Sequence, residues 1–401
     1  MPGEKPYEVV ISGSGPAGAG LALALTAREP ALAGRILVLE ASSHPREKIC
    51  AGGITADGVR QLSAWGAPIE VPAVPIKGVR LRFGDRWSDI PAPESGAVVV
   101  RRDVFDASLV RAVRDRGVEV REETPLLDLR RDASGVEVAI PGGSVRARCV
   151  VGADGVAGGV RRALRFPQGR RHVRLIVAET FDQTEPAESE GLFAFDFSCV
   201  ARGVQGYVWD FPCVIDGRRA MSRGIFDRAP DGVRRRDWKG EFARALAERG
   251  VPPDSVIWKG FPERAFDPRL PISMPRALLV GDAAGIDPLM GEGIAQSFVY
   301  AELAAETLLR AGRRNDYRFR EYHRKLLRSP LGRELRLTAR SADTLYSARH
   351  FPFWISLLFE SASVRKVVGE ALAEGGGLSQ RLGRITMAAL GRLITRGWQR
   401  A

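Results

Sequence analysis

The chain opens with an apolar run that breaks into glycines and then continues as small apolar residues. Residues 7–25, YEVVISGSGPAGAGLALAL, predict a buried β-strand, a tight turn and a helix. The run RILVLE at 35–40 predicts a second strand, and a strand, a helix and a strand in this order form a parallel βαβ unit. The pattern therefore predicts an α/β fold that begins with such a unit.

Later apolar segments predict two groups of strands and a second long helix. Short strands of the first group are expected at 76–83, 87–90, 98–100, 118–121, 126–130, 136–140 and 148–151. A second group alternates apolar and polar residues as antiparallel strands do, at 174–180, 191–199, 205–212 and 218–226. A buried strand at 277–280 then precedes a helix that is expected to end near Leu309.

The glycines after the first strand have the spacing of a dinucleotide cradle. Gly13 permits a tight turn, Gly15 lets backbone N–H groups approach a pyrophosphate, and Gly18 lets the helix pack close to its strand. Pro16 and Ala17 lie in the first turn of that helix, whose positive N-terminus favours phosphate. A strand before the glycines and a helix after them make this interpretation specific.

Acidic residues follow three of the predicted strands. Glu40 and Asp154 are placed to accept hydrogen bonds from ribose hydroxyls, and Asp282 from a ribose or ribityl chain. The helix after Asp282 can stabilise negative charge on a reduced flavin, which a nicotinamide does not require, so FAD is the expected cofactor. In this last element the expected cofactor contacts are Gly281, Asp282, Gly291, Gly293 and Ile294.

The loop after Glu40, ASSHPREKICAGGIT, is expected to face the bound nucleotide. Its Lys48 is a candidate cofactor contact, and its Cys50 either lies near the flavin chemistry or is a half-buried packing thiol. Arg102, at the start of a helix, either contacts a cofactor phosphate or is an ordinary solvated charge.

Aromatic residues recur at every second position in the second group of strands. They are Phe193, Phe195, Phe197, Tyr207, Trp209 and Phe211. Such a face is either core or, in part, the lining of an apolar substrate pocket beside the cofactor.

Composition and charge narrow the functional classes. The net charge is +12, but residues 313–401 carry 18 Lys or Arg and 7 Asp or Glu, so the excess lies in the tail and nucleic-acid binding is not expected. In this tail Leu378, Leu382, Ile385, Ala389 and Leu393 form one helical stripe, which either lies on an anionic membrane or packs on the body. The four cysteines do not have the spacing of metal ligands, and no apolar leader is apparent at the N-terminus. These features predict a cytoplasmic protein, with contact at the inner membrane face as the alternative.

Three motifs together resemble an FAD-dependent family with the glutathione-reductase-type nucleotide fold, which includes aromatic hydroxylases, flavin halogenases and geranylgeranyl reductases. The motifs are GSGPAG at 13–18, GADG at 152–155 and GDAAG with GEGI in 281–294. The segments KICAGG at 48–53 and YVWDFP at 207–212 resemble the geranylgeranyl reductase branch most closely.

The resemblance implies reduction of an isoprenoid or lipid-like C=C bond by FADH2, with Tyr207, Trp209 and Phe211 near the substrate. NAD(P)H is the expected transient reductant, and Cys50 and Tyr207 are the candidate proton donors. An apolar chamber with few polar groups around the flavin is expected to favour hydride transfer. The rival function is a flavin monooxygenase that hydroxylates a metabolite.

The predicted fold is thus an FAD-binding Rossmann domain of glutathione-reductase type, with an inserted antiparallel-sheet substrate domain and a helical C-terminal extension. The FAD-binding domain is assigned to 1–75, 97–168 and 271–310 and the substrate domain to 76–96 and 169–270. The helical region is assigned to 311–401.

Overall fold

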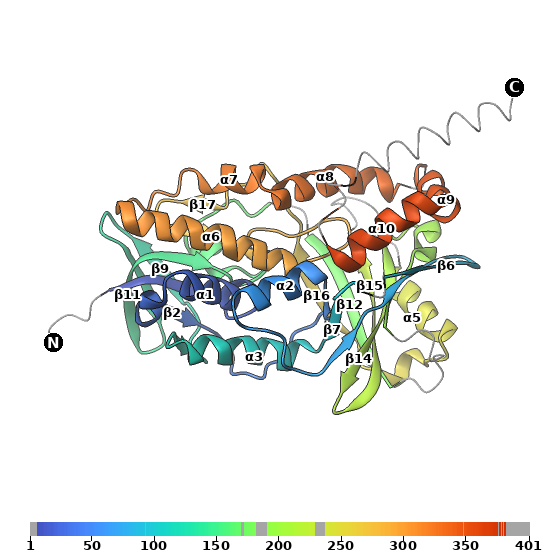
Figure 1. Cartoon of the computed structure of the whole chain (residues 1–401), viewed down its shortest axis with the longest axis horizontal. Helices are drawn as coiled ribbons and strands as arrows, with labels where there is room; N and C mark the ends of the chain where they lie inside the picture. Colours follow the sequence, from blue (N-terminus) through green and yellow to red (C-terminus); the bar gives the residue numbers. More distant parts are fainter. Residues whose placement is uncertain are drawn as a thin grey trace, which may run out of the picture.

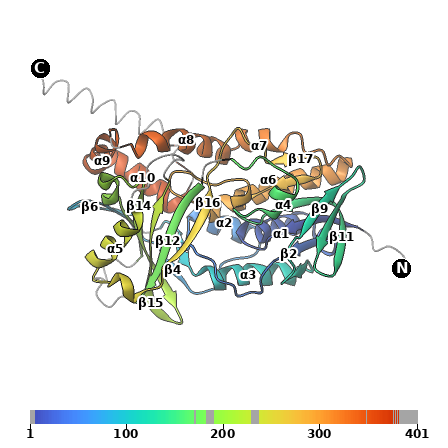
Figure 2. The same cartoon turned by 180° about the vertical axis from the view of Figure 1, so that it is seen from behind.

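The computed structural model describes residues 6–92, 94–169, 172–181, 191–228, 237–347, 349–375, 377, 379 and 381. Two sheets lie side by side along the long axis of the molecule, and C-terminal helices run along one edge of both (Figures 1 and 2). The predicted fold class is confirmed by this arrangement.

The first sheet has a parallel core in the order β18-β11-β1-β2-β8. These strands are β1 (Tyr7–Ser12), β2 (Ile36–Leu39), β8 (Glu119–Arg121), β11 (Gly143–Gly152) and β18 (Ala277–Leu279). Their apolar side chains are buried because α1 (Pro16–Arg28) packs between the sheet, α3 (Arg102–Asp115) and α6 (Ile294–Arg314). Three short strands extend this sheet, namely β9 (Asp128–Arg131), β10 (Val136–Ile140) and β17 (Ser273–Met274).

The second sheet has the order β16-β12-β15-β14-β13-β5-β6. Its strands are β5 (Gly78–Phe83), β6 (Arg86–Pro91), β12 (His172–Thr180), β13 (Leu192–Asp196), β14 (Gly206–Ile215), β15 (Arg218–Asp227) and β16 (Lys259–Arg264). Most neighbours are antiparallel, as expected, but β13 pairs with β5 in parallel. The sheet is therefore mixed at the point where the early hairpin joins the later strands.

Two details of this sheet differ from the sequence prediction. The strand expected over 191–199 ends at Asp196, because η3 (Ser198–Arg202) turns the chain into a 3₁₀ helix. Strand β16 was not predicted at all, since its sequence KGFPER contains Gly260 and Pro262. Pro is tolerated there because β16 is the edge strand of the sheet.

Smaller elements connect the two sheets. A three-stranded sheet consists of β3 (Gly53–Ile54), β7 (Val98–Val100) and β4 (Ala73–Pro75). The remaining helices before the C-terminal region are α2 (Ala56–Ala64), α4 (Gly159–Ala163) and α5 (Trp238–Glu248). Besides η3, the described residues form the 3₁₀ turns η1 (Pro30–Arg35), η4 (Pro253–Ser255) and η5 (Gly281–Ala283).

The C-terminal helices reach from the first sheet to the second (Figure 1). They are α7 (Tyr322–Arg328), α8 (Pro330–Leu345), α9 (Phe351–Glu360) and α10 (Ala362–Glu374). Helix α10 packs on β5, β6 and α2, and the Tyr346 hydroxyl at the end of α8 donates to the Leu289 carbonyl at 3.0 Å. No helix in the described ranges has the length and apolar character needed to cross a bilayer.

Candidate active site

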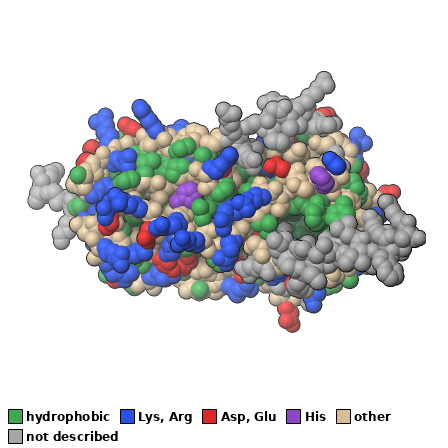
Figure 3. Space-filling model, turned by 90° about the horizontal axis from the view of Figure 1, so that it is seen from above, with side chains coloured by type: hydrophobic (Ala, Val, Ile, Leu, Met, Phe, Trp, Pro, Cys, Tyr) green, Lys and Arg blue, Asp and Glu red, His purple; other side chains and the backbone are tan. Residues whose placement is uncertain are grey.

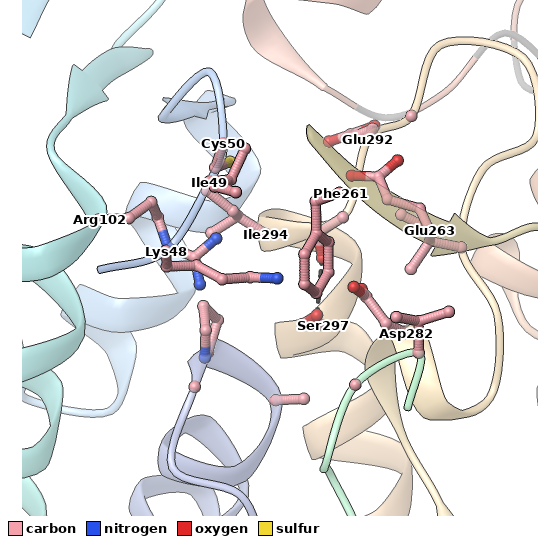
Figure 4. Close-up of a pocket in the computed structure, with 18 of the residues that line it drawn as sticks. Lys48, Ile49, Cys50, Arg102, Phe261, Glu263, Asp282, Glu292, Ile294 and Ser297 are labelled. Carbon is pink, nitrogen blue, oxygen red and sulfur yellow. Dashed lines mark hydrogen bonds between the residues drawn. The ribbon is translucent and has the colours of Figure 1, made fainter. Parts of the chain in front are cut away.

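A cavity of about 710 Å³ lies where the carboxyl ends of the parallel strands meet the inner face of the second sheet. The glycine turn, Glu40, Asp154 and Asp282 line one part, which we call the cofactor end. Phe193, Phe195, Tyr207, Trp209, Phe211 and Phe226 line the other part, which we call the aromatic wall. Residues 46–51, which we call the strap, and Arg102 close one side of the cavity (Figure 4).

The glycine turn lies at the cofactor end in the conformation that a pyrophosphate requires. Gly13 has a φ of +100°, and a Cβ there would lie 2.4 Å from the Ala153 carbonyl oxygen. A Cβ on Gly18 would lie 1.9 Å from the Gly13 oxygen, whereas one on Gly15 would meet nothing closer than 3.6 Å. The space above Gly15 and the Pro16–Ala17 helix start is therefore open to a ligand.

Glu40 lies beside this turn and is held by the backbone around it. Its Oε2 accepts hydrogen bonds from Ser14 N at 3.1 Å and Ser14 Oγ at 2.7 Å, and Oε1 accepts from Ser42 N at 3.1 Å. Burial opposes ionisation, but the Arg46 charge and these hydrogen bonds bring the pKa of Glu40 below its ordinary value. Glu40 is thus an anchored carboxylate at the edge where a ribose is expected.

Asp154 follows β11 and lines the cavity, with one oxygen engaged in hydrogen bonds and one without a partner within the described residues. Its Oδ2 accepts from Val160 N at 2.8 Å and from Ser12 Oγ at 3.3 Å. Its Oδ1 is buried and has no hydrogen-bond partner among the described residues. Burial raises the pKa of Asp154.

Asp282 and the start of α6 complete the cofactor end. A Cβ on Gly281 would lie 2.7 Å from the Ala17 Cβ, so the glycine lets the end of β18 approach α1 and directs Asp282 into the cavity. Gly291 has a φ of +70° and lies against Phe226. Gly293 precedes Ile294, the first residue of α6, and no described side chain caps this helix. Its free N–H groups can stabilise a negative ligand.

The strap directs two of the predicted residues into the cavity. Lys48 extends across it, with Nζ 3.6 Å from the centroid of the Phe261 ring, and burial lowers the pKa of Lys48 although Asp282 opposes this. Cys50 Sγ accepts from Gly52 N at 3.4 Å and is within hydrogen-bonding reach of the Arg102 side chain.

Arg102 is engaged by Asp106 on its own helix. Arg102 Nε and Nη2 donate to the two Asp106 oxygens at 2.8 and 3.0 Å. Arg46, which sequence reasoning did not select, lies nearer the glycine turn: its Nη2 is 3.6 Å from the Cβ position of Gly15. The Arg46 Nε has no hydrogen-bond partner in the described part of the chain. Arg46 is paired with acids as well, since its Nε lies 3.5 Å from Glu40 Oε1 and its Nη2 lies 3.4 Å from Asp106 Oδ2. Its place beside Gly15 makes it a second candidate to meet a phosphate, and its position shortly after Glu40 was the available signal.

The aromatic wall brings the three predicted substrate residues together on β14. The Tyr207 ring stacks on Phe226 with centroids 5.3 Å apart, and Phe211 packs on Phe193 at 4.7 Å. Trp209 occupies the space left by Gly224 on β15, where a Cβ would lie 2.1 Å from the indole. Phe197, in contrast, does not line the cavity and packs between Tyr207 and Phe351.

Buried acids make the cofactor end more polar than the apolar chamber expected from the sequence. Glu263 on β16, Glu292 before α6 and Asp287 all line the cavity (Figure 4). Burial is the largest cause in each case and raises the pKa of Glu263 to about 8, of Glu292 to about 7 and of Asp287 to about 6. Sequence reasoning missed Glu263 because it missed its strand.

The cofactor end fits FAD on features of the chain itself. Two uncapped helix starts, α1 and α6, open into one cavity, and Asp154, which has an unpartnered buried oxygen, and Asp282 both line it. The first helix start suits a pyrophosphate, and the second suits the negative charge of a reduced flavin.

Comparison with known proteins gives the family. A model described as FAD binding domain matches residues 6–325. The chain is 28% identical over 335 residues to the menaquinone reductase of Mycolicibacterium smegmatis, covering 77% of this chain and 78% of that protein. It is 27% identical over 374 residues to digeranylgeranylglycerophospholipid reductase 3 of Methanosphaera stadtmanae, covering 86% and 88%.

A hydroxylating enzyme and a solved structure are also similar. The 12-dehydrotetracycline 5-monooxygenase/anhydrotetracycline 6-monooxygenase of Streptomyces rimosus is 28% identical over 310 residues, which are 73% of this chain and 60% of that protein. A geranylgeranyl bacteriochlorophyll reductase-like protein from Thermoplasma acidophilum has the same fold, with a TM-score of 0.76 at 20% identity, covering 96% of this chain and 100% of that one. Because the family match spans most of the chain, this protein belongs to the FAD binding domain family and is an FAD-dependent oxidoreductase.

Proposed function

We propose that this enzyme reduces a C=C bond of an apolar substrate, with an isoprenoid lipid or a prenylated quinone as the substrate class. One observation carries the proposal: the aromatic wall adjoins the cofactor end within a single cavity. Helices α8 and α10 contribute Thr338, Ala371 and Leu372 to the same lining. An apolar lining of this extent suits a hydrocarbon chain better than a small polar metabolite.

The chain's own residues divide the task between the two parts of the cavity. Bound and reduced, FAD supplies a hydride. The aromatic wall would orient the alkene and exclude water from it, and the start of α6 would stabilise the charge near the cofactor. Tyr207 donates its hydroxyl hydrogen to the Met290 carbonyl, which leaves Cys50 as the less committed of the two predicted proton donors. We propose NAD(P)H as the transient reductant.

The relatives support a reductase function over a monooxygenase function. Two of them are named as reductases of isoprenoid compounds and are matched over more than three quarters of their length. A monooxygenase is the second candidate, because the buried acids and Lys48 give the cofactor end polar groups that a strictly apolar chamber lacks.

An anaerobic single-turnover experiment tests the proposal. The FAD-loaded enzyme is reduced with dithionite and mixed with a menaquinone or with a geranylgeranylated glycerophospholipid, while flavin absorbance and product mass are followed. Flavin reoxidation with a gain of two hydrogens in the isoprenoid chain, which persists after air has reoxidised any quinol, supports the reductase. No reoxidation without air, together with a gain of one oxygen atom in air, would replace it with the monooxygenase.

A lipid substrate also suggests contact with a membrane surface. Lys and Arg side chains gather over the face that carries α6 and α7 (Figure 3). The helical stripe expected between Leu378 and Leu393 lies largely outside the described residues, so its role stays a proposal. Co-sedimentation with anionic vesicles that is unchanged after deletion of 375–401 would remove this role from the tail.

A further inference from the structure

Glu263 is one of the carboxyl groups that line the cavity. It lies on the edge strand β16, and its Oε2 is buried and has no hydrogen-bond partner among the described residues. A Cβ on Gly291, whose φ is +70°, would lie 2.9 Å from the Phe226 ring and 3.2 Å from this oxygen, so the glycine leaves both side chains their present positions. An unpartnered buried carboxyl that lines a cavity requires a ligand or a chemical role to explain it.

The neighbours of Glu263 place it where the two parts of the cavity meet. On one side Gly291 contacts both Glu263 and Phe226, and Phe226 stacks on Tyr207 of the aromatic wall. On the other side Asp282 and Lys48 of the cofactor end interact electrostatically with Glu263. Figure 4 shows Glu263, Asp282 and the Lys48 ammonium around the Phe261 ring.

We propose that Glu263 donates the proton that completes reduction of the substrate C=C bond. This inference rests on the proposed function and deepens it. One alkene carbon gains a hydride and the other carbon gains the Glu263 proton, while FADH2 loses that hydride and releases one proton to solvent as it becomes FAD. The resulting carboxylate then takes a proton from water, and a reduced nicotinamide restores FADH2.

The charged groups around Glu263 keep its proton available near neutral pH. Burial raises the pKa of Glu263 to about 8; the carboxylates of Asp282 and Asp287 add to the rise, and Lys48 and Arg102 oppose it. Tyr207 and Glu292 also face this region, and neither carries a positive charge. Glu263 is therefore neutral below about pH 8 and loses its donor proton as the pH rises through that value.

The two proton donors predicted from the sequence, Tyr207 and Cys50, are less suitable for this role than Glu263. The Tyr207 hydroxyl hydrogen is directed to the Met290 carbonyl, and burial raises the Tyr207 pKa well above its ordinary value. Cys50 lies on the strap beside the Arg102 guanidinium, which Asp106 holds in place. Of the two oxygen acids among these three, Tyr207 and Glu263, only Glu263 has a buried oxygen without a partner among the described residues.

Two measurements on FAD-loaded protein test the assignment, with Glu263→Gln as the variant and the exposed Glu137→Gln as the matched control. Because Glu292 is also partly protonated at pH 7, the infrared spectra without substrate are expected to show protonated carboxyl absorbance that is reduced in Glu263→Gln and unchanged in Glu137→Gln. In the anaerobic single turnover with a menaquinone and with a geranylgeranylated glycerophospholipid, Glu263→Gln is expected to slow flavin reoxidation by about 10²-fold or more. The wild-type rate should fall above about pH 8, and the variant should lack this decline.

The outcomes separate this inference from the proposed function. If the wild type hydrogenates a probe and Glu263→Gln does so at the same rate, the donor assignment is overturned and the reductase stands. A Cys50→Ala variant that shows the large loss instead would transfer the role to the thiol. If the wild type reduces neither probe, the reductase function itself fails, and the donor role fails with it.

Discussion

The Lys48 ammonium lies 3.6 Å from the centroid of the Phe261 ring, which joins the strap to β16 across the cavity. This cation also lies near Asp282 and Glu263, two acids on different elements. A single side chain from the strap therefore acts on the charge state of Glu263, and its removal should be visible in the titration of that acid.

Replacing Lys48 with Met should move the alkaline decline of the single-turnover rate to higher pH. The positive charge opposes the rise in the Glu263 pKa, so its loss makes the proton harder to remove. The measurement is the rate against pH at saturating FAD, with Lys325→Met as the control, since Lys325 pairs with Glu306 far from the cavity. A decline that stays in place or moves to lower pH would contradict the coupling.

Asp282→Ala should weaken FAD binding. The carboxylate faces the cavity at the end of β18, and loss of a charged hydrogen-bond acceptor costs about 1.5–3 kcal/mol, or roughly 10- to 150-fold in Kd. Titration of the FAD-free protein by flavin fluorescence measures this. The exposed Asp316→Ala is the control, and equal dissociation constants for the two variants would exclude Asp282 from the cofactor site.

Gly13→Ala should lower both thermal stability and FAD retention. The positive φ costs about 1–3 kcal/mol for a residue with a side chain, and the new Cβ would clash with the Ala153 carbonyl at 2.4 Å. Gly34→Ala serves as the comparison because nothing lies within 4 Å of its Cβ position. We expect a lower Tm and colourless protein for the first variant only, as judged by thermal melting and absorbance.

Asp210→Ala should destabilise the second sheet without a direct effect on FAD. Asp210 accepts from Arg223 Nε at 2.9 Å and from Arg249 Nη2 at 2.6 Å, and Arg223 is almost fully buried. Removal of one partner from a buried ion pair costs about 3–5 kcal/mol. The exposed pair of Arg80 and Asp89 is the matched control, where Asp89→Ala should cost about 0–1 kcal/mol in denaturant unfolding.

The free energy of unfolding of the FAD-free protein should fall as the pH rises from about 4.5 to about 8. Glu263, Glu292 and Asp287 have raised pKa values in the folded state, so in this window the folded chain binds more protons than the unfolded chain. Glu122, whose pKa is lowered to about 2, acts only below this window. Melting temperatures at several pH values should show a smaller decline for Glu263→Gln, and an equal decline would argue against a buried neutral acid.

The residues of the cofactor end could be predicted from local patterns in the sequence. Gly13, Gly15 and Gly18 have a recognisable spacing between a strand and a helix, so they could be found without tertiary information, although the close contact that requires Gly13 is with the distant Ala153. The acids at the ends of β2, β11 and β18 could likewise be predicted, because parallel strands bring their carboxyl ends to the same edge. The aromatic residues at every second position of β14 identified the inner face of the second sheet, because alternate residues of a strand point to the same side.

Tertiary structure alone decided which groups meet at the centre of the cavity. Glu263 lies on a strand whose Gly and Pro conceal it, and it becomes buried only because β16 pairs with β12 and lies beside Gly291. The parallel pairing of β13 with β5 and the closure of the cavity by α8 and α10 also depend on contacts between distant segments. Burial sets the charge state of these acids, and burial is a property of the packed chain that no local pattern of residues contains.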